Sequence, residues 1–179
     1  MLRIMLVPAL LTAAAALLLL VHGRQQPPQR VMSAVVIGKG GAADATGPLT
    51  QRYGLAAGVI VDERVFKSPG DGVHWLLLDP YGDETLRGSL TDGDPIQHWQ
   101  TACNHADEGS LLLMYSGGPA RPTPVAAIAG WLPEEAGAYA LMARKEAGGW
   151  IALQEDRAAD RQAEIAARPL VFKKPQAAP

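Results

Sequence analysis

Cysteine is almost absent from this chain of 179 residues, which contains only Cys103. One thiol cannot form a disulfide within its own chain, so the protein is not a small disulfide-stabilised scaffold. Zinc ribbons and iron–sulfur proteins bind their metals through several thiolates, which this chain cannot supply. We therefore predict that the protein has no cofactor.

Charged residues are also scarce, at 19% of the chain, and neither sign dominates. The chain has 16 Lys and Arg against 18 Asp and Glu, which gives a formal net charge of -2. Nucleic-acid-binding domains normally carry a strong basic excess, so no nucleic-acid partner is expected. At 48% hydrophobic residues, the chain is too apolar to be intrinsically disordered. Its length is typical of one folded domain.

Familiar catalytic motifs are missing as well. The sequence contains no Gly-x-Ser-x-Gly, Ser-x-x-Lys or His-Glu-x-x-His pattern and no EF-hand loop. Several acidic residues cluster in one part of the chain, but each adjoins Gly or Pro, which is typical of turns and not of paired acid–base catalysis. These residues are Asp71, Asp79, Asp83, Asp92 and Asp94. The absence of a catalytic signature favours a non-enzymatic function.

The longest hydrophobic run lies at the N-terminus. Residues 4–21 contain no charged side chain, and a helix of this length spans roughly 27 Å, close to the hydrocarbon thickness of a bilayer. Residues 1–23 are interpreted either as an uncleaved signal-anchor, which the apolar length favours, or as a cleaved signal peptide. Residues 24–30 are rich in Pro and Gln and are predicted to form a stalk.

Both interpretations of the N-terminus export the rest of the chain. With an anchor, the globular domain of residues 31–168 lies in the periplasm at the inner membrane. With a cleaved signal peptide, the same domain is a soluble periplasmic protein. Residues 169–179 are predicted to form a frayed C-terminal tail.

Hydrophobic periodicity predicts many strands and few helices within the domain. The expected strands are 31–37, 58–66, 73–79, 84–90, 110–116, 138–144 and 150–155. The last two are predicted to form a hairpin, with a helix beginning at Pro133 as the alternative. The Ala-rich residues 156–168 are predicted to form a helix that ends before Pro169. The expected fold class is α+β, with a mainly antiparallel sheet of about five to seven strands and one or two packed helices.

A turn provides the most specific structural prediction. Asp79, Pro80 and Gly82 occupy the first, second and fourth positions of a type I β-turn. The apolar runs 73–79 and 84–90 should therefore form a hairpin. This interpretation makes Asp79 a structural residue, because an Asp side chain at this position accepts hydrogen bonds from turn amides.

A helix start follows the hairpin. Asp94 fits the N-cap, Pro95 the first helical position and Gln97 the third, which is the capping-box arrangement. The helix is predicted to run to about Ala106 with one apolar face against the core.

The same helix contains the best candidate for a metal site, formed by His98, Cys103 and His105. Histidines seven residues apart lie about 10.5 Å apart along the helix axis, whereas zinc needs ligand atoms at about 2.0–2.3 Å. Cys103 also falls on the apolar face, opposite the two histidines. No metal site is therefore predicted, and we expect two solvent-facing histidines and a buried thiol.

The leading hypothesis is a non-enzymatic accessory or assembly subunit of a bacterial envelope complex. Its partners would be other envelope or inner-membrane proteins, with residues 4–21 in the lipid bilayer. The alternative is a soluble periplasmic binding domain or small hydrolase-type domain whose site is assembled from residues far apart in the sequence. A surface pocket lined by His74 or His98 with an acid would favour the alternative, and a flat apolar patch would favour the accessory subunit.

Overall fold

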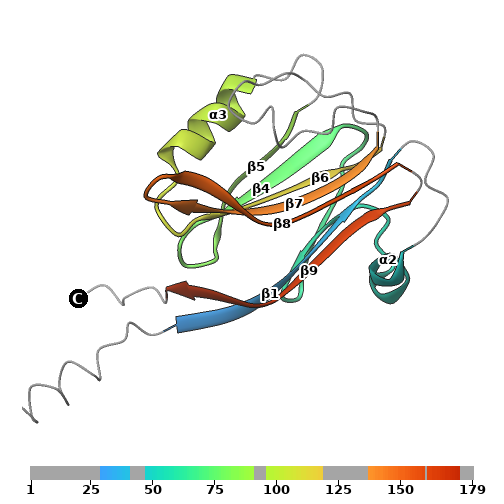
Figure 1. Cartoon of the computed structure of the whole chain (residues 1–179), viewed down its shortest axis with the longest axis horizontal. Helices are drawn as coiled ribbons and strands as arrows, with labels where there is room; N and C mark the ends of the chain where they lie inside the picture. The colour runs from blue at the N-terminus through green and yellow to red at the C-terminus, as the bar shows by residue number, and fades with distance from the viewer. Residues whose placement is uncertain (1–28, 41–46, 91–95, 119–136, 160, 174–179) are drawn as a thin grey trace, which may run out of the picture.

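The computed structural model describes residues 29–40, 47–90, 96–118, 137–159 and 161–173. They form two β-sheets that pack face to face, with one helix on the outer face of each sheet (Figure 1). The predicted membrane anchor and most of the predicted stalk lie outside these ranges. Within them, no helix is long and apolar enough to cross a membrane.

Sheet A has four strands in the order β3-β2-β1-β9, and neighbouring strands run antiparallel. Its strands are β1 (Gln29–Gly38), β2 (Gly58–Val61), β3 (Arg64–Lys67) and β9 (Ala163–Lys173). The first and last described strands of the chain are therefore neighbours in the sheet (Figure 1).

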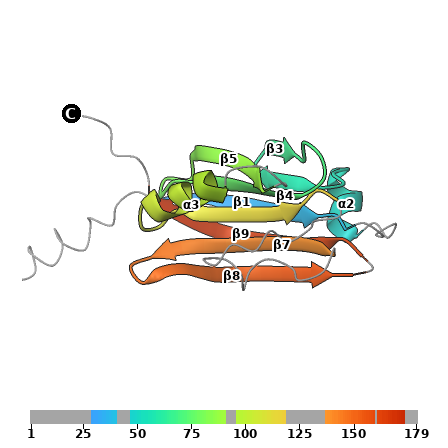
Figure 2. The same ribbon diagram turned by 90° about the horizontal axis from the view of Figure 1, so that it is seen from above.

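Sheet B has five strands in the order β5-β4-β6-β7-β8, and its neighbouring strands are also antiparallel. Its strands are β4 (Val73–Leu78), β5 (Glu84–Leu90), β6 (Leu111–Ser116), β7 (Ala138–Glu146) and β8 (Gly149–Ala158). Figure 2 shows β8 along one side of the two-layered structure and β3 and β5 toward the other. The edge strands β3 and β5 thus belong to different sheets but lie on the same side.

The main core lies between the two sheets, because alternate residues of each strand point inward. Val36 and Ile165 of sheet A belong to one buried cluster with Leu76, Leu113 and Met142 of sheet B. Burying an aliphatic side chain of this size contributes about 1.5–3 kcal/mol. This shared cluster makes the two sheets one folding unit.

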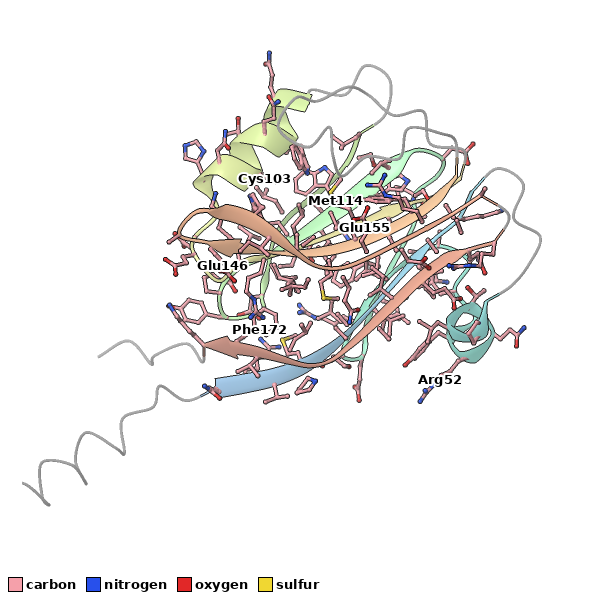
Figure 3. All side chains as sticks on the ribbon, in the orientation of Figure 1. Arg52, Cys103, Met114, Glu146, Glu155 and Phe172 are labelled. Atoms are coloured by element: carbon pink, nitrogen blue, oxygen red, sulfur yellow. The ribbon has the colours of Figure 1, made fainter. Side chains whose placement is uncertain are left out.

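Two helices cover the outer faces. α3 (Ile96–His105) packs Trp99 and Cys103 against sheet B, and Figure 3 shows Cys103 between the helix and the strands. α2 (Pro48–Tyr53) packs against the outer face of sheet A. This short helix begins with a proline and ends before Gly54, whose φ of 62° is left-handed.

The fold is mostly β, with two sheets, and not the α+β domain predicted from the sequence. The coarser expectation of mainly antiparallel sheet with few helices is confirmed. The predicted helix at 156–168 is wrong, because these residues end β8 and begin β9. Alanine favours helices, but Ala163, Ile165 and Ala167 point alternately into the core, and pairing with β1 outweighs that intrinsic preference.

Pro169 was expected to end the regular structure. It lies instead within β9. It stands opposite a register shift between Met32 and Ala34 of β1. A proline is tolerated in a sheet at such an irregularity, where the ladder hydrogen bonds are already interrupted. β9 continues to Lys173, so the sheet extends into the predicted tail, whose residues 174–179 lie outside the described part.

The other predicted strands are present, with one change. Residues 58–66, predicted as one strand, form the hairpin of β2 and β3, in which Asp62 has a left-handed φ of 53°. The hairpin predicted over residues 138–155 is confirmed as β7 and β8. Pro133, where the alternative helix would begin, lies outside the described residues.

Candidate functional site

In the turn between β4 and β5, the carboxylate of Asp79 is hydrogen-bonded to the backbone. Its Oδ1 accepts hydrogen bonds from the backbone amides of Tyr81 at 2.8 Å and Asp83 at 2.9 Å. The Gly82 amide donates to the Asp79 carbonyl at 3.0 Å, and Gly82 has a φ of 85°, which favours glycine. Pro80 is buried beside them. Asp79 therefore has a structural task in this turn.

The predicted helix cap is described only in part. Asp94 and Pro95 lie outside the described residues, so the capping box stays a prediction. Gln97 is in the first turn of α3 with an exposed side chain.

The metal candidates on α3 do not come together. His98 and His105 are exposed, whereas Cys103 is buried. Burial raises the pKa of the Cys103 thiol to about 12, although the charge of Lys145 lowers it slightly. Across the described ranges, no group of three His, Cys, Asp or Glu residues is placed to hold a metal ion.

His74, which the sequence analysis named only as a possible pocket residue, lies in a cleft of about 410 Å³. The cleft opens on the side of the molecule where the edge strands β3 and β5 face each other. β3 supplies Phe66 and Lys67 to its wall, and β5 supplies Arg87 and Ser89. Neighbouring strands β4 and β6 supply further lining residues, including His74 and Tyr115.

The register of sheet B assembles these side chains. His74 of β4 stands directly opposite Ser89 of β5 and, on its other side, opposite Tyr115 of β6. Residues opposite each other in an antiparallel pair share one face of the sheet. Their side chains accordingly meet: the rings of His74 and Tyr115 are 5.4 Å apart between centroids.

Both ring nitrogens of His74 are hydrogen-bonded. Nε2 lies 2.8 Å from the carbonyl oxygen of Gly70, and Nδ1 lies 2.7 Å from Ser89 Oγ. A carbonyl oxygen can only accept, so Nε2 carries the proton, and Nδ1 accepts the hydroxyl proton of Ser89. Two consecutive hydrogen bonds thus start in the cleft: the Ser89 hydroxyl donates to His74, and His74 donates to the Gly70 carbonyl.

Burial keeps this imidazole neutral. His74 is 3% exposed, and desolvation lowers its pKa, although the Gly70 carbonyl and the negative charge of Asp71 act in the opposite direction. Tyr115 is neutral for a similar reason, because burial raises its pKa to about 12 while the charge of Arg87 opposes the shift. The inner wall of the cleft therefore presents uncharged hydrogen-bonding groups at neutral pH.

The loop before β4 holds the Gly70 carbonyl in place. Ser68 Oγ donates to this carbonyl at 2.8 Å, and the Gly72 carbonyl accepts from the Gly117 amide at 2.8 Å. A Cβ at position 117 would overlap Gly70 O and approach His74 Nε2 to 2.7 Å. Glycine at this position is thus required for the loop to reach the histidine.

The rim of the cleft is cationic. Arg87 lies two residues from Ser89 on the same strand, so both side chains project from the same face. Its Nε is 3.4 Å from a carboxylate oxygen of Glu84, but its side chain remains 66% exposed. An exposed ion pair of this kind contributes at most about 1 kcal/mol, so the guanidinium can exchange Glu84 for another anion. Lys67 adds a second positive charge from β3.

A wider and more open hollow of about 840 Å³ lies by the start of β1. Its charged groups already serve the fold: Arg30 pairs with Asp83 at 2.8 Å, Arg64 donates to the Gly82 carbonyl at 3.2 Å, and Asp62 accepts from the Ser33 amide at 2.8 Å. The smaller cleft, with a histidine that faces a serine, is the better candidate.

Comparison with known proteins does not place the chain in a family. No protein-family model matches it, and no curated protein matches it significantly. The functional argument therefore rests on the geometry of the cleft.

Sequence reasoning found one member of this cleft and missed the others. His74 was singled out, but Ser89, Arg87 and Lys67 belong to no motif. The available signal was the predicted hairpin, which brings β5 beside β4. Its register, however, is shifted by an irregularity between Leu77 and Leu78 that the sequence does not reveal.

Proposed function

We propose that this protein is an exported binding domain that takes a small anionic ligand in the cleft between β3 and β5. The observation that carries the proposal is the pairing of cationic side chains at the rim with the neutral Ser89–His74 pair at the wall. The acid near the histidine is Asp71, whose charge acts on His74. This arrangement favours the binding-domain alternative over an accessory subunit.

The dimensions and chemistry of the cleft support a small ligand. Sites for small molecules usually enclose about 300–1,000 Å³, and this one encloses about 410 Å³. A guanidinium donates two parallel hydrogen bonds to a carboxylate or phosphate, which makes Arg87 the main anchor. Ser89 and Tyr115 supply hydroxyl groups, and Phe66 supplies an apolar surface.

The test is calorimetric titration of the purified protein with a panel of small mono- and dicarboxylates and phosphate monoesters. We expect one class to bind, and Arg87→Ala to weaken that binding about tenfold or more. Arg52→Ala is the matched control, because Arg52 projects outward from α2 (Figure 3) and is not one of the residues that line the cleft. Binding that survives Arg87→Ala, or no binding by any member of the panel, would contradict the proposal.

A second candidate function follows from an apolar surface on sheet A. Val31 and Val171 are paired across β1 and β9, and they are 62% and 41% exposed. They lie at the end of β1 that connects to the predicted stalk. We propose, as the second candidate, that this surface docks an envelope or inner-membrane protein while residues 4–21 anchor the chain in the inner membrane.

This second candidate is tested by purification in mild detergent. A partner that copurifies with the full chain should be lost from a Val31→Asp, Val171→Asp double variant that still binds its anion. If the chain is instead released from membranes as a soluble periplasmic protein without residues 1–23, the anchor is contradicted and the cleaved signal peptide is supported.

A further inference from the structure

We propose that Ser89 is a nucleophile and His74 its general base, so that the cleft hydrolyses small carboxylic esters that carry a negative charge. The proposal rests on the proposed function, because it uses the same cleft and the same cationic rim to hold the substrate. It adds a covalent step to binding.

The geometry of a nucleophile, a base and an orienting group is present. Ser89 Oγ lies 2.7 Å from His74 Nδ1, within the range that allows direct proton transfer. The other nitrogen of the ring is held by the Gly70 carbonyl at 2.8 Å. A carbonyl here has the role that a carboxylate has in a Ser–His–Asp triad, since it fixes the tautomer and the plane of the ring.

The surroundings of His74 suit a general base. The buried imidazole is neutral at rest, so Nδ1 has a free lone pair for the serine proton. The imidazolium that forms during reaction is stabilised by the Gly70 hydrogen bond and by the charge of Asp71. The groups in contact with the ring are the neutral Ser89 and Tyr115, and the exposed cations Arg87 and Lys67 line the same cleft.

Ser89 is accessible to a substrate, although its partner is buried. Ser89 is half-buried and lines the cleft, whereas His74 is 3% exposed. The serine lies within a strand and not at a Gly-x-Ser-x-Gly elbow, which explains why no sequence motif marks it. A hydrogen bond that only joined β5 to β4 would not need its serine at a cleft wall.

Arg87 can stabilise the charge that develops during the reaction. Two residues along a strand are separated by roughly 7 Å, and an arginine side chain is long enough to bring its guanidinium over the hydroxyl of Ser89. A cation in this position stabilises the oxyanion of a tetrahedral intermediate. Lys67, across the cleft, is placed to hold the negatively charged part of the substrate.

The reaction balances with an ester and water as the only reactants. Ser89 Oγ attacks the ester carbonyl carbon while its proton passes to His74 Nδ1. The C–O bond to the alcohol then breaks, and the leaving alkoxide takes the proton from Nδ1, which leaves an acyl-serine. Water attacks this acyl group, gives one proton to Nδ1 and releases the carboxylic acid as Ser89 Oγ regains the proton.

The experiment treats the purified protein with a fluorophosphonate probe and locates the adduct by mass spectrometry. We expect the adduct on Ser89, together with hydrolysis of the p-nitrophenyl monoester of succinic acid. Ser89→Ala should abolish labelling and lower kcat/KM by at least about 10²-fold. Ser33→Ala is the control, because Ser33 lies outside the cleft in β1 and should change neither readout.

Two further measurements separate catalysis from folding. In Ser89→Cys, iodoacetamide should alkylate the thiol faster than it alkylates an ordinary exposed cysteine, because His74 takes the thiol proton; His74→Asn should remove this acceleration. In the wild type, kcat/KM should fall as the pH falls and His74 becomes protonated, with a midpoint below the ordinary imidazole value of about 6.5.

The outcomes distinguish this proposal from the proposed function. If the anion binds and depends on Arg87, but Ser89 of the wild type is not labelled and Ser89→Cys reacts at an ordinary rate, the nucleophile is refuted and the binding function stands. If neither binding nor labelling occurs, both proposals are refuted.

Discussion

At the scale of single residues, the most informative group is His74, because it is buried, polar and fully hydrogen-bonded. A buried polar side chain is stable only when its hydrogen bonds are satisfied, and here Ser89 and Gly70 satisfy both nitrogens. The same contacts set the protonation state of the ring. The pH dependence of stability is therefore a direct test of the burial.

The unfolding free energy should rise with pH in the range where the unfolded histidine titrates. The pKa of His74 is lowered in the folded protein, so below about 6.5 the unfolded chain binds a proton that the folded chain does not bind. His74 thus destabilises the fold as the pH falls below this value and has no effect above it. Denaturant titrations from pH 5 to 8 should show this slope, and His74→Asn should reduce it; an unchanged slope would contradict the buried neutral ring.

Cys103 is the second residue whose environment makes a clear prediction. It is 4% exposed between α3 and sheet B, and burial raises its pKa to about 12. Cys103→Ser should lower the unfolding free energy by about 1–3 kcal/mol, because the hydroxyl is placed among apolar groups. A thiol reagent should modify the native protein far more slowly than the unfolded protein at pH 7. Equal rates would show that the thiol is accessible.

At the scale of secondary structure elements, the β4–β5 hairpin shows what the sequence reveals and what it does not. The turn at Asp79 and Gly82 is determined by local chemistry, because the Asp79 carboxylate accepts two amide hydrogen bonds and Gly82 adopts a positive φ. Continued from the Leu78–Glu84 pair without interruption, the register would place His74 opposite Gly88. The observed irregularity near Leu78 places it opposite Ser89 instead. A bulge depends on the packing of the whole sheet, so the site could not be assembled from local patterns.

β9 is the element for which local patterns misled most. Its Ala residues and following Pro169 are typical of a helix and its end, and only the alternation of buried side chains indicates a strand. That alternation is weak, because alanine is small and fits either face. The partner strand β1 decides the outcome, and it lies at the opposite end of the sequence.

The turn also makes a prediction at this scale. Asp79→Ala removes an acceptor for two backbone amides, so the unfolding free energy should fall by about 1–2 kcal/mol. Anion binding in the cleft should be unchanged while the variant is folded. Glu108→Ala is a suitable control, because Glu108 is exposed in the segment after α3. A folded Asp79→Ala variant with an unchanged melting temperature and lost binding would make Asp79 part of the site.

At the scale of the whole molecule, the two sheets are joined at one corner by close backbone contact. The amide of Lys39, directly after β1 of sheet A, donates to the carbonyl of Ser116 in β6 of sheet B at 2.7 Å. A Cβ on Gly38 would overlap the Tyr139 carbonyl. Any residue larger than glycine at position 38 would require β1 and β7 to move apart.

Gly38→Ala should therefore destabilise the entire domain. We expect a loss of about 1–3 kcal/mol, as for other substitutions that overfill a packed interior. Gly148→Ala is the matched control, because a Cβ at Gly148 meets no atom within 4 Å. Thermal unfolding of the two variants, compared with wild type, measures the difference; equal melting temperatures would contradict the close contact of the sheets.

The pairing of β1 with β9 has a consequence for how the chain folds. The first described strand cannot complete its hydrogen bonds until the last one has been made, so β1 waits for most of the chain to be synthesised. Contacts between distant parts of a sequence form slowly, and until they form, the free edge of β1 can pair with another chain. A chain that ends before residue 163 should consequently lack the partner strand of β1 and be prone to aggregation.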